Sequence, residues 1–206
     1  MERIADMKPN ELAEECRFSN DHVRKNEAKH LLRVGPDNPH LLVLPGICNT
    51  EFLSDLLALI YICDRLNSDI SLFCAGNASL ATWNRLKFEN VEKIHINENA
   101  ADLPLLMDSA DLMLSEPDPC TASDAVSRHL PLIFSHNERN ALPPVCMDLI
   151  GRNCAVLGSD DEVELAELRL SLLTQETKRK QMERAFQSIS TSNDAERGSV
   201  IYDRRR

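Results

Sequence analysis

The sequence predicts an α/β protein with a Rossmann-like, doubly wound parallel sheet of about six strands. From residue 40 onward, short apolar runs that suit buried strands alternate with longer segments of helical periodicity. Turn-forming residues separate these segments. A strand–helix alternation of this kind gives parallel strands with helices on both faces of the sheet. Right-handed crossovers then favour the strand order 3-2-1-4-5-6.

The strands are expected where short apolar runs lie between polar or turn-forming residues. The first follows the loop Gly35–Pro39, and the fourth follows an acidic helix end. Each run is short enough for a strand and too short for a typical helix. The six expected strands are His40–Leu44, Ile70–Ala75, Val91–Ile96, Ala110–Leu114, Leu130–Phe134 and Cys154–Leu157.

The helices are expected where apolar residues recur on one helical face or where a capping residue precedes such a segment. Asn97 or Asn99 could cap the third helix, and Thr121 and Asp124 have the spacing of a capping box, so a helix should start near Thr121. The last helical stretch is expected in two pieces. The expected helices are Glu51–Asn67, Asn77–Leu86, Ala101–Ser109, one from Thr121, Leu142–Gly151 and Asp160–Ser188.

The chain divides into three parts. Residues 1–39 form an N-terminal helical segment and linker, with helices expected at Pro9–Cys16 and Asp21–Arg33. Residues 40–188 form the Rossmann-like domain. Residues 189–206 form a polar C-terminal tail, which we expect to be frayed or ordered against a partner.

Composition limits the class of protein. The 206 residues are 43% hydrophobic and 27% charged, which is typical of a globular chain with a buried core. The net charge of −10 argues against nucleic acid as a partner, since binding to its backbone needs clustered Lys and Arg. No apolar run is long enough to cross a membrane, and the N-terminus lacks a signal-peptide core. The seven irregularly spaced cysteines favour reduced thiols in the cytoplasm and indicate no zinc site.

A ligand site is expected where the strands end. In doubly wound sheets, ligands bind beyond the carboxyl ends of the strands, near the switch between strands 1 and 4. Here those ends are Pro45–Thr50 and Ser115–Asp124. Both loops lead into helix N-termini, whose N–H groups and dipole favour a phosphate. A nucleotide site is therefore the first hypothesis.

The stretch from Ala28 to Ser188 resembles the C-terminal half of family 28 glycosyltransferases. These enzymes include the bacterial N-acetylglucosaminyltransferase of peptidoglycan synthesis and the diacylglycerol glycosyltransferases. The residues A-D-L-M-L-S, T-A-S-D-A-V and L-P-L-I-F resemble the family's strand–loop–helix–strand signature, in which T-x-x-E-A precedes G-x-P-x-I. The residues N-E-R-N-A-L and I-G-R-N-C-A-V resemble its Q-E-x-x-N-A segment and the G-x-A strand that follows.

The resemblance implies one domain of a GT-B enzyme that binds a nucleotide-sugar donor, usually a UDP-sugar, with backbone atoms of residues 97–100 along the base. It implies that Asp124, where the family has Glu, binds the ribose hydroxyls, with Thr121 and Ser123 beside it. It also implies contacts from two other loops. Those loops contribute Gly46, Asn49 and Thr50 near the phosphates, and Glu138 and Asn140 near the donor sugar or the phosphates.

This chain departs from the family at both phosphate loops. Gly46 is the one glycine in a first loop that is usually glycine-rich, and Pro117-Asp118-Pro119 replaces an expected glycine pair. Proline removes N–H donors, and Asp118 repels a diphosphate unless a cation lies between them. We expect no cofactor besides the donor and no metal site. A magnesium ion that bridges Asp118 or Glu116 to the diphosphate remains the alternative.

Length is the other departure, because a GT-B transferase carries its acceptor site and catalytic base on a second domain of similar size. We therefore expect the acceptor to bind to a missing domain or to a partner chain. Any peripheral membrane contact is expected through such a partner. The catalytic residues are unknown. The other hypothesis is a catalytically inert Rossmann-like interaction module with a degenerate donor pocket. Each of these residues also has a purely structural interpretation under either hypothesis: Asp124 completes the capping box, Glu138 and Asn140 cap the next helix, and the histidines lie at the surface. An ordinary dehydrogenase is disfavoured, since no G-x-G-x-x-G follows the first strand.

Overall fold

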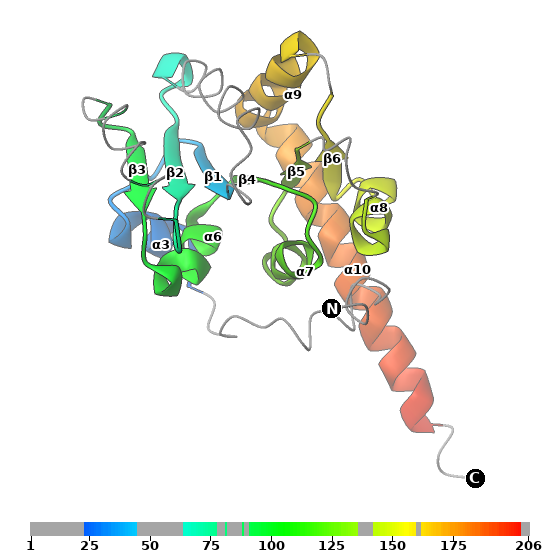
Figure 1. Ribbon diagram of the computed structural model, residues 1–206. Helices are drawn as coiled ribbons and strands as arrows, with labels where there is room; N and C mark the ends of the chain where they lie inside the picture. The colour runs from blue at the N-terminus through cyan, green and yellow to red at the C-terminus, as the bar shows by residue number, and fades with distance from the viewer. Residues whose placement is uncertain are drawn as a thin grey trace.

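The chain forms a parallel six-stranded sheet covered by helices on both faces (Figure 1). The computed structural model describes residues 23–44, 64–77, 81, 88, 91–135, 142–159 and 162–202, except the side chains of 162, 163, 165, 166 and 190–202. The strand order is β3-β2-β1-β4-β5-β6, and every neighbouring pair is parallel, which confirms the predicted fold class and order. The strands are β1 His40–Leu44, β2 Asp69–Phe73, β3 Ile94–Asn97, β4 Leu112–Ser115, β5 Leu132–Phe134 and β6 Ala155–Leu157.

Alternate residues of the central strands face two separate parts of the hydrophobic core. In β1, Leu42 packs in one apolar cluster, and its neighbours Leu41 and Val43 pack in the other. All three are fully buried. A strand that is apolar at successive positions must be covered on both sides, because its side chains alternate between the two faces. Burial on both faces of the sheet therefore explains why the strand segments of the sequence are apolar at successive positions.

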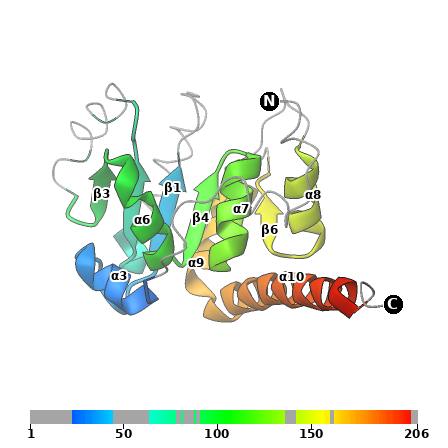
Figure 2. The same ribbon diagram turned by 90° about the horizontal axis from the view of Figure 1, so that it is seen from below.

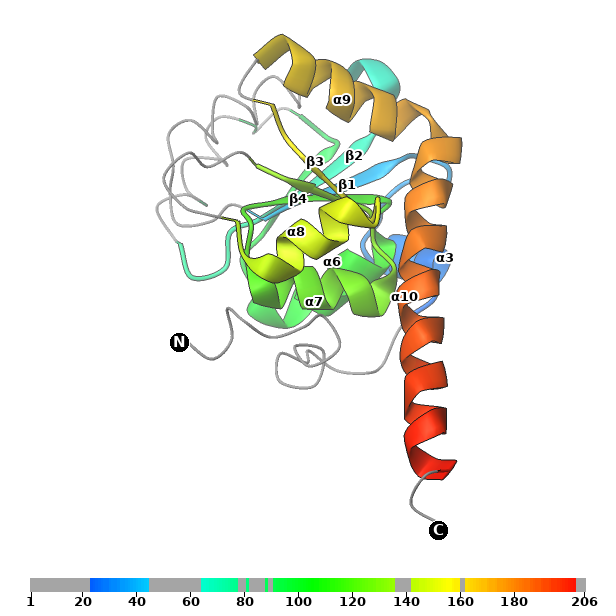
Figure 3. The same cartoon turned by 90° about the vertical axis from the view of Figure 1, so that its right-hand side faces the viewer.

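The helices divide between the two faces. Figure 3 shows the sheet between α9 on one side and α6, α7 and α8 on the other. Met107, Ala125 and Leu149 from these three helices share one cluster, whereas Leu172 and Leu173 of α9 belong to the opposite one. The helices are α3 Lys25–Leu31, α6 Leu103–Ser109, α7 Pro119–Arg128, α8 Pro144–Gly151, α9 Glu162–Thr174 and α10 Glu176–Tyr202, with a 3-10 turn at Ala100–Asp102.

The sheet has two polar edges, here called the amino edge and the carboxyl edge after the ends of the strands that form them. At the amino edge, α3 packs beside α6, and α10 crosses the domain nearby (Figures 2 and 3). Lys25 of α3 lies 3.7 Å from Glu183 of α10, measured from Nζ to Oε1. The carboxyl edge lies at the opposite end, where β4 leads into α7.

Several expected boundaries differ from the observed ones. Strands β4 and β5 begin two residues later than expected, because Ala110 and Leu130 at the expected starts are buried without belonging to the sheet. Asn99 accepts a hydrogen bond from the Ala101 N–H at 3.2 Å and so is the expected cap. The tail from Ile189 was expected to be frayed or ordered against a partner, and in the structure its backbone continues α10 to Tyr202. The expected helices at 9–16 and most of 51–67 and 77–86 lie outside the described residues.

Candidate functional site

The switch point of the sheet lies between β1 and β4. These central strands are hydrogen-bonded neighbours, and their last residues, Leu44 and Ser115, are paired in register. Strand order proceeds from β1 toward β3 on one side and from β4 toward β6 on the other. The connections after β1 and β4 therefore leave in opposite directions, which is the arrangement that opens a ligand crevice in doubly wound sheets. The described part of this crevice is the β4–α7 connection.

Three of the eight predicted site residues lie just after this connection, on helix α7. Thr121 and Asp124 are three residues apart and so are neighbours on one side of the helix, whereas Ser123 is turned by about 100° from Asp124. Ser123 and Asp124 are buried, and Thr121 is half-buried. The structure thus brings Thr121 and Asp124 together. The other five predicted residues lie outside the described residues: Gly46, Asn49, Thr50, Glu138 and Asn140.

Helix α7 begins earlier than the sequence predicted. Its first residue is Pro119 and its N-cap is Asp118, whose Oδ2 accepts a hydrogen bond from the Thr121 N–H at 2.7 Å. The predicted capping box of Thr121 and Asp124 is therefore wrong. Proline suits the first helical position, and Asp is a stronger N-cap than Thr. Asp124 lies six residues after the cap, so capping does not explain its burial.

The carboxyl edge near α7 is acidic. Glu116 follows β4, and burial raises the pKa of its carboxyl group. On α8, the pKa of the buried Cys146 thiol is about 12, mainly because of burial and further because of the nearby Asp118 carboxylate. Cys146 is therefore a protonated core residue and no nucleophile at neutral pH.

One backbone and one side-chain hydrogen bond order the carboxyl ends of β4 and β5. The Ser135 N–H donates to the Ser115 carbonyl oxygen at 2.8 Å, and Ser115 Oγ donates to the Glu116 carbonyl oxygen at 3.0 Å. These bonds fix the start of the β4–α7 connection. Among the described residues, no three His, Cys, Asp or Glu side chains are close enough together to hold a metal ion. A magnesium bridge from Asp118 or Glu116 therefore stays an untested alternative.

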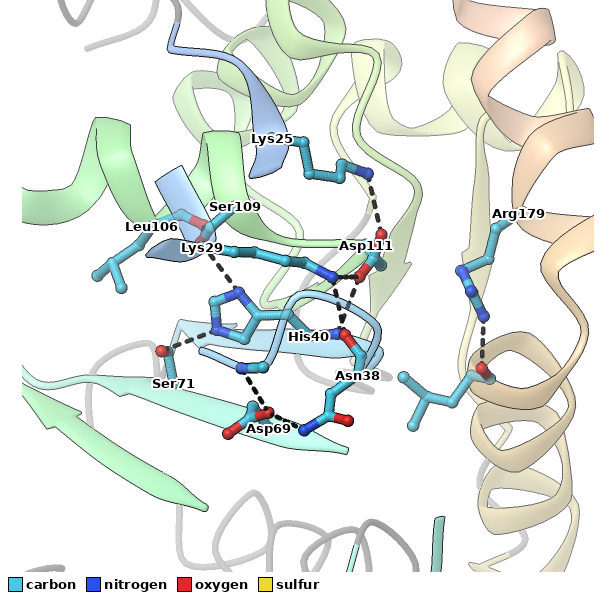
Figure 4. A network of polar contacts seen from close by, with 12 residues as sticks. Lys25, Lys29, Asn38, His40, Asp69, Ser71, Leu106, Ser109, Asp111 and Arg179 are labelled. Carbon is cyan, nitrogen blue, oxygen red and sulfur yellow. Dashed lines mark hydrogen bonds and ion pairs between the residues drawn. The ribbon is translucent and has the colours of Figure 1, made fainter. Parts of the chain in front are cut away.

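The amino edge carries a buried polar network that the sequence did not predict (Figure 4). Lys29 Nζ lies 2.7 Å from Asp111 Oδ2, and the His40 backbone N–H donates to the same oxygen at 3.0 Å. The His40 side chain is fully buried, so the expectation of surface histidines is wrong for it. Residues 40, 69 and 111 each stand at or just before the start of an apolar run. A polar residue at the start of an apolar run was the sequence signal that could have indicated this network. It does not show which residues are the partners.

Asp69 organises a second part of the amino edge. Its Oδ2 accepts hydrogen bonds from Asn38 Nδ2 at 2.8 Å and from the Gly35 N–H at 3.3 Å, and its Oδ1 lies 3.2 Å from His95 Nε2. Burial tends to raise the pKa of Asp69, but the bonds from Asn38, His95 and Gly35 together lower it. These contacts join the loop before β1 to β2 and β3, so the amino edge is occupied by structural interactions.

A cavity of about 420 Å³ also opens on the amino side, between the ends of α6 and α7 and the middle of α10. The buried ion pair of Arg128 Nε with Asp108 Oδ1, at 3.1 Å, lies in its wall. Neither Thr121 nor Asp124 lines this cavity. Its size therefore gives no support to the predicted donor site, which lies at the other end of α7.

Solved structures with a similar architecture include a glycosyltransferase and a UDP-GlcNAc 2-epimerase. WaaG, a glycosyltransferase involved in lipopolysaccharide biosynthesis, superposes with a TM-score of 0.63 at 16% identity over 84% of this chain and 48% of that one. MurG of Acinetobacter baumannii superposes with a TM-score of 0.59 at 12% identity, over 82% of this chain and 50% of that one. The UDP-GlcNAc 2-epimerase of Neisseria meningitidis was solved with UDP-GlcNAc bound. It superposes with a TM-score of 0.61 at 12% identity, over 82% of this chain and 48% of that one. The chain has the fold of a GT-B domain.

The chain spans about half the length of these solved structures. Identities of 12–16% establish the fold and nothing about the ligand. No protein-family model and no curated protein sequence matches the chain. Within the described part of the chain, no helix is long and apolar enough to cross a membrane.

Proposed function

We propose that this GT-B domain is the nucleotide-sugar-binding half of a glycosyltransferase that transfers a hexosyl or N-acetylhexosaminyl group. The acceptor and the catalytic base would lie on a further domain or a partner chain, as the family 28 resemblance implies for a C-terminal half. Support comes from the shared fold, since one neighbour is solved with UDP-GlcNAc bound. The observation that carries the proposal is Asp124, a buried carboxylate on the helix that follows the switch point.

The proposed roles are those that the family 28 resemblance implies. Asp124 accepts hydrogen bonds from the ribose hydroxyls, and Thr121 lies beside it on the same side of α7. Ser123 is assigned to the same helix start. Gly46, Asn49 and Thr50 are assigned to the phosphates, and Glu138 and Asn140 to the donor sugar or the phosphates.

The proposed chemistry needs no covalent intermediate on this domain. The domain would hold the donor so that C1 of the sugar faces an acceptor bound elsewhere. Orientation and stabilisation of the departing nucleotide would supply the rate enhancement. The metal alternative has a direct test, since a magnesium bridge makes donor affinity depend on magnesium.

Calorimetry with UDP and UDP-GlcNAc, with and without magnesium, tests the proposal. The wild-type protein should bind both ligands, and Asp124→Ala should weaken binding by roughly 1–3 kcal/mol, as for the loss of a hydrogen bond to a charged group. The matched control is Asp148→Ala, which removes an exposed carboxylate of α8 that pairs with Arg152. It should leave the affinity unchanged.

The inert interaction module is the second candidate, and a specific observation favours it. The Asp118 carboxylate already occupies the start of α7, where a donor phosphate would be stabilised. Absence of binding up to millimolar UDP and UDP-GlcNAc, in either buffer, would establish this alternative. An Asp124→Ala variant that binds as tightly as wild type would remove Asp124 from the site.

A further inference from the structure

The first turn of α7 has fewer backbone donors left for a ligand than an ordinary helix start. A helix start ordinarily presents four N–H groups without helical partners, those of the N-cap and of the next three residues. In α7, Pro119 has no N–H, and the Thr121 N–H donates to Asp118 Oδ2 at 2.7 Å. Two of the four positions therefore offer nothing to a phosphate, and Asp118 or Pro119 accounts for both.

Asp118 also places a negative charge at the start of α7. The positive end of a helix dipole attracts anions, and here the Asp118 carboxylate already fills that role. Glu116 lies two residues earlier on the same connection. The charge of Asp118 also reaches α8, where it helps to raise the pKa of the Cys146 thiol. A diphosphate brought to this turn would meet like charge in a partly buried setting, where repulsion is stronger than in water.

The fold does not require this charge. Asn is as good an N-cap as Asp, because the cap needs an oxygen that accepts the hydrogen bond from the helix and not an ionised group. Pro119 would keep its favourable first position after such a change. The negative charge of Asp118 can therefore be removed with its capping role retained, so its effect on a ligand can be measured apart from its effect on folding.

We propose that Asp118 is a specificity-determining residue of the donor site, whose carboxylate occupies the anion position at the start of α7 and weakens the binding of nucleoside diphosphates. The inference rests on the proposed donor function and refines it. Affinity for a donor then comes mainly from the nucleoside and the sugar, and little of it from the phosphates at α7.

The test is UDP titration by calorimetry in magnesium-free buffer with EDTA, on wild type, Asp118→Asn and Glu176→Gln. Glu176 is a matched charge control, since it lies on the first turn of α10 and pairs with Lys180. We expect Asp118→Asn to bind UDP roughly tenfold more tightly than wild type, as removal of a repelling charge predicts. We expect Glu176→Gln to match wild type. Thermal unfolding should show that Asp118→Asn is folded, because the cap is retained.

The outcomes separate the inference from the proposed function. If wild type binds UDP and Asp118→Asn binds it no more tightly, the donor function stands and the inference is overturned. An equal gain in Glu176→Gln also overturns it, because net charge would then be the cause. Binding by Asp118→Asn alone supports the inference and leaves wild type as the inert module. Absence of binding by all three proteins overturns both.

Discussion

The His40 side chain joins three elements at the amino edge of the sheet. Its Nε2 lies 2.9 Å from Ser71 Oγ of β2, and its Nδ1 lies 2.9 Å from Ser109 Oγ of α6 (Figure 4). Burial lowers the pKa of His40 to about 4, outweighing the opposing effects of the Ser109 hydrogen bond and the Asp111 carboxylate. The folded protein therefore keeps this ring neutral at pH values where an exposed histidine is protonated.

Stability should depend on pH through His40. The unfolded chain binds a proton at this residue with the ordinary pKa of 6.5, whereas the folded chain binds it only near pH 4. The stabilising contribution is thus complete above pH 6.5 and is lost between pH 6.5 and pH 4, by on the order of 3 kcal/mol. Urea denaturation in pH steps measures this loss.

His40→Gln, which cannot titrate, should flatten the pH dependence in that window. The control His30→Gln replaces an exposed histidine of α3 and should keep the wild-type slope. A His40→Gln protein with an unchanged slope would contradict the assignment.

Individual side chains were the least predictable level of this molecule. The partners of His40 lie 31 and 69 residues away along the chain, so no local pattern shows that its ring is buried and satisfied. At α7, Asp118 and Thr121 compete for the cap within one short segment, and the stronger cap is the observed one. The sequence did place Thr121 and Asp124 on one helix at the switch point, because strand order and helix periodicity suffice for that.

At the level of elements, α9 and α10 are joined by a buried arginine. Arg179 of α10 donates from Nη1 to the carbonyl oxygen of Leu172 at 2.7 Å and also to that of Leu173. Both carbonyls lie in the last turn of α9, where backbone oxygens lack helical partners and a cation is favourable. The Arg179 side chain of α10 thus caps the carboxyl end of α9.

Arg179→Met should lower the free energy of unfolding by about 2 kcal/mol. Methionine keeps much of the buried stem but leaves two carbonyl oxygens without this charged donor. Arg184→Met, on an exposed position of the same helix, is the control and should change stability by less than about 0.5 kcal/mol. Urea denaturation of the two variants measures the difference. Equal stability of the two proteins would contradict the capping role.

The existence and order of the described elements followed from hydrophobic periodicity, whereas their ends did not. Ala110 and Leu130 are buried but precede their strands, because burial extends beyond the hydrogen-bonded ladder. The continuation of α10 past Ile189 was missed for the opposite reason. Helical hydrogen bonds can continue through a polar segment that offers no apolar face to detect.

For the whole molecule, the alternation of strands and helices was enough to predict the sheet. Right-handed crossovers leave few topologies for such a chain, and the observed order is the predicted one. Function does not follow from this fold, which many activities share. The functional account therefore depends on where a ligand binds. It requires the carboxyl edge to bind a donor and the amino edge to serve the structure only.

Hydrogen–deuterium exchange with and without UDP-GlcNAc tests that claim most directly. We expect slower exchange in the presence of ligand over Ser115–Val126, which contains the β4–α7 connection and Asp124. Exchange at the amino edge, including the loop before β1, should be unchanged. Unchanged exchange throughout the chain, or protection confined to the amino edge, would contradict the account.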